Sequence, residues 1–274
     1  MNKNILKYGI ILALVPIIFA GCGENKELSP SDANSAKGEA VSEVTEAFTD
    51  IRVSAASGTI TLSEGEEFSL SYHLSEKEIV KEAYVKDGTL IFSTGADRRF
   101  KPDFGDFYVD ITIPEGHSLS EIDLSSVAGD VVLKVSDFED AELFTVSGSI
   151  KAENTSGKKL EAETTSGNIE FTNVKSVEAE AQTVSGKITS EGNFGKFEGE
   201  TISGSIASKG EITNEAKLET VSGNISFNGN VSSVEAVTAG KITYMGNTQG
   251  KKLNISQGEP YLYAKSISGA IAIN

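Results

Sequence analysis

Glutamates recur along the second half of the chain at a spacing that could gather them on one surface. When the glycine of the following Ser-Gly pair is counted as zero, they lie at positions −6 and −4, with Glu235 close to that register. Six of those in register are Glu161, Glu163, Glu180, Glu198, Glu200 and Glu219. A row of carboxylates could bind cations or a positively charged partner. It could also be a solvated face that keeps a sheet soluble and blocks its lateral growth, which is the simpler interpretation.

The only cysteine, Cys22, carries a second candidate chemistry, the attachment of lipid. Two lysines and an apolar run over residues 10–19 precede it, and this run is too short to cross a membrane. The Ala20-Gly21-Cys22 core resembles the bacterial lipobox, although Phe19 stands where leucine is usual. The resemblance implies that residues 1–21 are a lipoprotein signal peptide and that Cys22 is diacylated. An ordinary secretory signal with a chance cysteine is the alternative.

Residues 22–47 are polar and lack aromatic residues, so they predict a flexible tether with a reach on the order of 25–30 Å. Together with the lipid anchor, they place the protein outside the cytoplasm, on the outer face of a bacterial membrane. The formal net charge is −16 and no basic stripe is present. We therefore expect the membrane to be a partner through the anchor, and we exclude nucleic acid as a partner.

Residues 96–108 concentrate aromatic and basic side chains in an otherwise acidic chain. The candidate binding residues are Arg98, Arg99, Phe100, Lys101 and Phe104. They could form a recognition loop for an envelope protein or a glycan. The alternative is that the phenylalanines cover the open N-terminal end of a repeat core.

Groups that could catalyse a reaction or bind a metal are sparse. His73 and His117 are the only histidines, and they lie far apart in the sequence. The calcium-binding Gly-Gly-x-Gly-x-Asp repeat and the Gly-x-x-x-x-Gly-Lys phosphate loop do not occur. We therefore expect no catalytic residues, no metal site and no cofactor.

The elements that would position the glutamates are marked by a Ser-Gly pair at intervals of 17–19 residues. Its glycines are Gly129, Gly148, Gly167, Gly186, Gly204, Gly223 and Gly240, with alanine in place of the serine before Gly129 and Gly240, and a last copy stands at Gly269. A repeat this short predicts stacked coils that share one core. The spacing of apolar residues does not fit a helix. The sequence therefore predicts an all-β fold, a single-stranded parallel β-solenoid with about 19 residues per coil, right-handed by the general preference of parallel crossovers.

Within a coil, β-branched residues occupy positions −2 and +2, and isoleucine dominates position +2. We expect the isoleucines at +2 to form a buried ladder and the residues at −7, −5 and −3 to point inward. This assignment requires the alternation to slip between −3 and −2. We expect the glycine to form the corner by its positive φ and by close backbone approach, and the preceding serine to bond a backbone group there. Second corners are expected at Gly192, Gly210 and Gly229.

Residues 48–125 are rich in strands but do not keep the period. They hold an early copy, Ser57-Gly58-Thr59-Ile60, a strand over 88–92 and a strand that ends at Ile113-Pro114. We expect them to form an irregular cap with the first coils, and residues 126–274 to form the regular coils of one domain over 48–274.

The order of these elements, followed by serial Val-Ser-Gly-x-Ile units, resembles the bacterial putative-adhesin family over residues 48–274. The resemblance implies an exported β-solenoid at the cell surface with a loose link to adhesion or envelope stress. It supplies no catalytic residues.

Three hypotheses about function remain open. The first is a non-enzymatic surface module that binds an envelope protein or a glycan. The second is a polysaccharide-active enzyme on a parallel β-helix, which would need carboxylates converging in a cleft. The third is a purely structural spacer. A fold alone does not choose among them.

Overall fold

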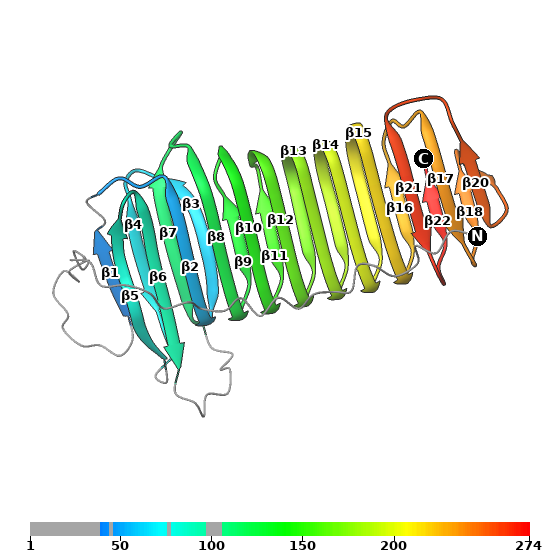
Figure 1. The fold of residues 1–274 in the computed structure, drawn as a ribbon. Coiled ribbons are helices and arrows are strands. Elements are labelled where there is room, and N and C mark those ends of the chain that lie inside the picture. Colours follow the sequence, from blue (N-terminus) through cyan, green and yellow to red (C-terminus); the bar gives the residue numbers. More distant parts are fainter. Residues whose placement is uncertain (1–38, 44–45, 76–77, 97–105) are drawn as a thin grey trace.

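The computed structural model describes residues 39–43, 46–75, 78–96 and 106–274. These residues form strands, turns and bends, and no helix occurs among them. The strands hydrogen-bond into one continuous, mostly parallel sheet that winds into an elongated stack of coils (Figure 1). The predicted all-β solenoid is therefore confirmed.

The first strands are β1 (Glu39–Glu43), β2 (Asp50–Ser57), β3 (Thr59–Gly65), β4 (Ser69–His73), β5 (Glu78–Lys86), β6 (Thr89–Ala96) and β7 (Tyr108–Pro114). The middle strands are β8 (Leu119–Ala128), β9 (Val131–Lys134), β10 (Phe138–Ser147), β11 (Ile150–Glu153), β12 (Ser156–Ser166), β13 (Ile169–Ser185), β14 (Ile188–Ser203) and β15 (Ile206–Ser222). The last are β16 (Ile225–Asn228), β17 (Ser233–Thr238), β18 (Ile242–Tyr244), β19 (Asn247–Thr248), β20 (Lys252–Ile255), β21 (Tyr261–Ser266) and β22 (Ile271–Ile273).

Each coil has two main faces that meet at the Ser-Gly corner. The long face is built by the residues at −8 to −2, and the short face by those at +1 to +5. Ile150, Ile169, Ile188 and Ile206 lie level with one another on successive coils. All four are at most 1% exposed, so the isoleucine ladder at +2 is confirmed.

Aromatic side chains fill the middle of the stack. Phe171, Phe194 and Phe197 are almost fully buried, and the rings of Phe194 and Phe197 stack with centroids 5.1 Å apart. Small residues at +4 make room for them, because Ser190 and Ser208 are buried there and hydrogen-bond to each other at 3.0 Å. Large and small side chains thus alternate along the core, which keeps it close-packed.

The Ser-Gly corner is formed by close backbone approach. A Cβ added to Gly167 would lie 1.8 Å from the carbonyl oxygen of Gly148, and other ladder glycines are as crowded. The expectation of positive φ holds within this ladder only at Gly58 (φ 92°). Glycine is needed here because stacked coils bring successive corners together with no room for a side chain.

The hydroxyl that bonds the corner belongs to the threonine at −3. Thr164 Oγ1 donates to Gly148 O at 3.0 Å, and Thr183 Oγ1 donates to Gly167 O at 3.1 Å. The serine at −1 was expected in this role, but at the regular corners, as at Ser166 and Ser185, it is exposed. Each buried threonine thus satisfies a carbonyl of the previous coil that would otherwise be costly to bury.

The expected slip of the alternation between −3 and −2 is wrong. The threonines at −3 are buried, whereas Val146, Ile202 and Val221 at −2 are 39–44% exposed. The alternation of the long strand therefore continues through −2, and the break lies between −2 and −1, which both face outward. Thr238 was assigned to −2, but it lies level with Ser266, at −3 of the neighbouring coil.

The stacking order differs from the sequence order at both ends. The early coil of β2 and β3 lies between β6–β7 and β8–β9, so Gly58 is the direct neighbour of Gly129. At the other end, β21 and β22 lie between β15–β16 and β17–β18, where β21 is the red strand in Figure 1. Antiparallel strands cover the ends: β4 and β5 at one, and β19 and β20 at the other.

Candidate binding surface on the long face

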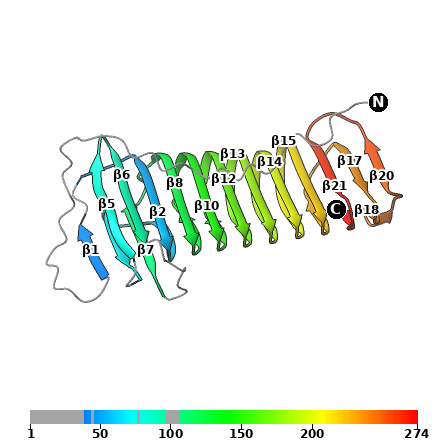
Figure 2. The same ribbon diagram turned by 60° about the horizontal axis from the view of Figure 1, so that its bottom comes forward.

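The long face brings the predicted glutamates together in register. Glu161, Glu180 and Glu198 lie level on β12, β13 and β14, and so do Glu163, Gln182 and Glu200. Figure 2 shows the strands of this face side by side, from β6 and β2 at one end to β21, β17 and β20 at the other. The alignment follows from the constant coil length, which repeats each outward position one strand further along.

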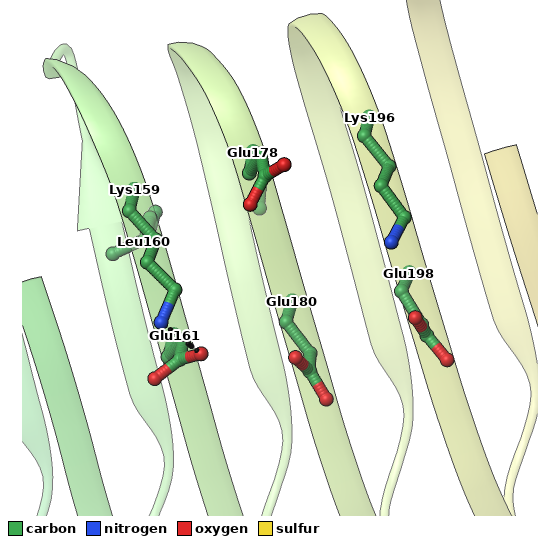
Figure 3. Close-up of a pocket in the computed structure, with 8 residues that line it drawn as sticks. Lys159, Leu160, Glu161, Glu178, Glu180, Lys196 and Glu198 are labelled. Carbon is green, nitrogen blue, oxygen red and sulfur yellow. Dashed lines mark ion pairs between the residues drawn. The ribbon is translucent and has the colours of Figure 1, made fainter. Parts of the chain in front are cut away.

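A third row on the same face alternates in charge. Lys159, Glu178, Lys196 and Glu215 lie level at position −8 on successive strands. The first three of these, together with Glu161, Glu180 and Glu198 of the row at −6, line a shallow depression over the buried Leu160 and Ala179 (Figure 3). Lys159 Nζ lies 2.7 Å from the Glu161 carboxylate.

Lysines interrupt the glutamate stripe toward the C-terminal end, which the sequence analysis missed. Lys217 follows Glu198 in the row at −6, and its ammonium group contacts the carboxylates of Glu198, Glu200 (2.6 Å) and Glu219 (3.3 Å). Lys265 Nζ lies 3.1 Å from Glu219. The signal was present for Lys217, since it occupies position −6 in its own repeat.

The pKa values differ along the stripe. Burial, together with the charge of Glu180, raises the pKa of Glu163 above its usual value. Burial also raises the pKa of Glu180, where the hydrogen bond from Gln182 opposes the shift and the charges of Glu198 and Glu161 add to it. At Glu219 burial would raise the pKa, but Lys265 and Lys217 outweigh it and the pKa is lowered. The middle of the stripe is thus repulsive, and its C-terminal part is ion-paired.

Two tyrosines lie on β21, next to the ion-paired residues of β15. Tyr261 and Tyr263 point outward from β21 and are half-buried. Tyr263 lies level with Lys217 on one side and with Glu235 on the other. The Tyr261 hydroxyl donates to Glu235 Oε2 at 3.0 Å. Burial and this hydrogen bond raise the pKa of Tyr261 to about 12, so the hydroxyl keeps its proton at neutral pH.

Comparison with known proteins places the chain in a family. The sequence profile of a family described as Toastrack DUF4097 matches residues 48–245. The chain belongs to the Toastrack DUF4097 family. No curated protein sequence matches the chain. In this Toastrack protein the matched range ends before β20, β21 and β22.

The chain is similar to solved structures of bacterial proteins. A putative adhesin from Bacteroides fragilis NCTC 9343 is 16% identical, with a TM-score of 0.55, over 87% of this chain and 98% of its own. A putative adhesin from Parabacteroides distasonis ATCC 8503 is 14% identical, with a TM-score of 0.49, over 87% and 98%. A putative lipid binding protein from the same Parabacteroides strain is 15% identical, with a TM-score of 0.46, over 86% and 97%. At 16% identity, the likeness to the Bacteroides fragilis protein shows a common fold.

The other predicted sites of this Toastrack protein lie elsewhere. Cys22 and the group Arg98, Arg99, Phe100, Lys101 and Phe104 lie outside the described residues. His73 stacks on the Phe107 ring, and His117 Nε2 lies 2.7 Å from the Phe48 carbonyl oxygen. In the described part of the chain, no group of three or more His, Cys, Asp or Glu has a metal-binding arrangement. The same part contains no helix that is long and apolar enough to span a membrane.

Proposed function

We propose that this Toastrack protein is a lipid-anchored binding module of a bacterial cell surface, adhesin-like, which acts without catalysis. It presents the long face of its solenoid to a component of the cell envelope. The observation that carries the proposal is the arrangement of this face, where charged and aromatic side chains from successive strands stand in level rows on a rigid, open surface. A surface of this shape offers many contacts to a large partner.

Two further observations support the proposal. The Ala20-Gly21-Cys22 motif and the polar residues 22–47 suit a protein that is held at a membrane by lipid and raised from it by a tether. Two solved structures with this architecture carry the name putative adhesin. The segment with Arg98, Arg99, Phe100, Lys101 and Phe104 is an alternative binding surface on the same module.

Site-directed photo-crosslinking tests whether the long face contacts the partner. Cys22 is the only cysteine, so when it is acylated an introduced cysteine is the only free thiol. Gln182→Cys and Val237→Cys put a benzophenone maleimide on the long face. Thr189→Cys and Thr243→Cys are matched controls that put it on the short face beside the same corners. The lipidated full-length proteins are then irradiated on envelope preparations from cells that lack the protein.

We expect the long-face probes to capture envelope material, the short-face probes not to, and excess unlabelled protein to compete. Equal capture from both faces, or none from the long face, would refute the use of the long face. Proteinase and periodate treatments of the captured material then show whether the partner is a protein or a glycan.

A further inference from the structure

The C-terminal end of the long face carries a cluster that differs from the rest of the stripe. Tyr263 lies between Lys217 and Glu235, and the antiparallel strand β20 extends the row to Asn254, which lies level with Glu235. Lys265 lies level with Glu219 in the next row. We call the group Tyr261, Tyr263, Glu219, Glu235, Asn254 and Lys265 the tyrosine platform.

The Tyr261 ring is fixed along the sheet surface. Glu235 lies one strand over from Tyr261 and level with the residue two positions further on, Tyr263. The Tyr261 hydroxyl reaches this carboxylate, so its ring must extend diagonally from β21 toward β17. A ring held in this way loses little conformational entropy when a ligand packs on its exposed surface.

The two lysines beside the rings are already engaged in ion pairs. Lys217 contacts Glu198, Glu200 and Glu219, and Lys265 contacts Glu219. A strongly charged partner would have to break these pairs. A neutral ligand rich in hydroxyl groups can instead hydrogen-bond to the outer oxygens of paired carboxylates and leave the pairs intact.

We propose that the tyrosine platform binds a neutral polysaccharide. The apolar faces of successive sugar rings pack on Tyr261 and Tyr263, and their hydroxyl groups bond to Glu235, Asn254 and Glu219. This inference rests on the proposed function. It adds the chemical class of the partner and the part of the long face that binds it.

A neutral glycan suits the platform better than a protein does. Protein hot spots bury aromatic anchors in closely packed, desolvated pockets. Here the aromatic side chains belong to the platform itself, they lie on an open face, and polar side chains that can bond hydroxyl groups surround them. Tyrosine combines a flat apolar ring with a polar edge, which matches the two kinds of surface on a sugar ring.

Affinity electrophoresis of the full-length protein tests the inference. The gels contain one neutral polysaccharide each: β-glucan, xylan, glucomannan or galactan. We expect at least one to retard the wild type. Tyr261→Ala and Tyr263→Ala should each weaken the interaction about tenfold. Phe144→Ala is the matched control, because Phe144 is an outward, half-buried aromatic residue on the long face at the other end of the stripe.

One variant and one measurement separate the effect of the ring from that of the hydroxyl group and from that of the fold. Tyr263→Phe should keep most of the binding, since the ring makes the contact. Thermal melting should be the same for all platform variants. The chain has seven tyrosines and no tryptophan, so saturable quenching of tyrosine fluorescence gives an independent measure of binding.

If no gel retards the wild type and no fluorescence change occurs, or if Tyr261→Ala and Tyr263→Ala bind like wild type, the platform does not bind neutral glycan. Long-face crosslinking to a proteinase-sensitive partner would then still support the proposed function. Loss of both the crosslinks and the retardation would refute both.

Discussion

At the scale of single residues, each repeat position has a separate physical task. Glycine permits the close approach of successive corners, and the threonine at −3 satisfies the glycine carbonyl of the coil before it. The isoleucine at +2 supplies buried apolar surface. Substitutions at these positions should therefore destabilise the protein for different reasons.

Gly167→Ala should destabilise the protein by more than about 3 kcal/mol, because its Cβ would lie 1.8 Å from the Gly148 carbonyl oxygen and the stacked backbone cannot move aside. Gly250→Ala is the control, since nothing lies within 4 Å of a Cβ there. Urea denaturation measures both. Similar stability of the two variants would show that the corner is not crowded.

Ile188→Ala should lower the free energy of unfolding by roughly 2–5 kcal/mol, because it leaves a cavity at a fully buried position. Ile188→Asp should be worse, since it buries an unpaired charge. Thr189→Ala on the outward side of the same strand is the control. The inward assignment would be disproved by an aspartate variant that melts at the wild-type temperature.

Glu163→Gln with Glu180→Gln should stabilise the protein at pH 7. Both carboxyl groups have raised pKa values in the folded state, so the folded protein gains stability as the pH falls from above the folded pKa toward the usual value of 4.5. Removing the charges should add a few tenths to about 1 kcal/mol at pH 7, since solvent screens both groups.

The wild type should become more stable as the pH falls from neutral toward the usual carboxyl pKa. The same double variant should show a smaller gain. Glu153→Gln with Glu170→Gln on the short face is the matched control. Melting temperatures across this pH range measure the effect. A double variant that is less stable than the wild type at pH 7 would contradict the claim that the carboxylates of Glu163 and Glu180 repel each other.

At the scale of elements, the last coil in the sequence lies between two earlier coils of the stack. β21 hydrogen-bonds to β15 on one side and to β17 on the other, although β17 precedes it in the chain. The last 14 residues therefore join two coils that have no direct contact along the sheet. Each coil of a solenoid depends on its neighbours, so the effect of losing this one should be local.

Deletion of residues 261–274 should expose the edges of β15 and β17 and release the segment from β16 to β20. Hydrogen exchange should show lost protection over residues 225–255 and retained protection in β12 and β13, which serve as the internal control. Loss of protection along the whole stack would show that the coils unfold as one cooperative unit.

At the scale of the whole molecule, the solenoid is an elongated, acidic body that the lipid and the tether would hold near a membrane (Figure 1). The net charge of the full chain is −16, which repels anionic headgroups, so the proposed anchor would have to supply the membrane affinity.

Cys22→Ala should abolish lipid attachment and move the protein from the detergent phase to the aqueous phase. Metabolic labelling with a palmitate analogue and detergent partitioning measure this. Melting should stay unchanged, because Cys22 lies outside the predicted domain. Unchanged labelling in the variant would disprove the lipobox assignment.

The sequence alone determined the interior of the regular coils. A constant period with β-branched residues at fixed positions specifies which side chains point inward, because a strand alternates and a stack repeats. The isoleucine ladder and the alignment of Glu161, Glu180 and Glu198 follow from this rule. The place of Lys217 follows from the same rule, because this lysine occupies position −6 of its repeat.

Only the tertiary structure decided which coils are neighbours at the ends. Local patterns do not encode the pairing of β2 with β8 or of β21 with β17, because these contacts join segments separated by long connections. For this reason the sequence could not place Tyr261 and Tyr263 beside Lys217 and Glu235. The close approach at the glycine corners was expected from the stacked repeat, whereas only the structure showed that Gly58 alone in this ladder has positive φ.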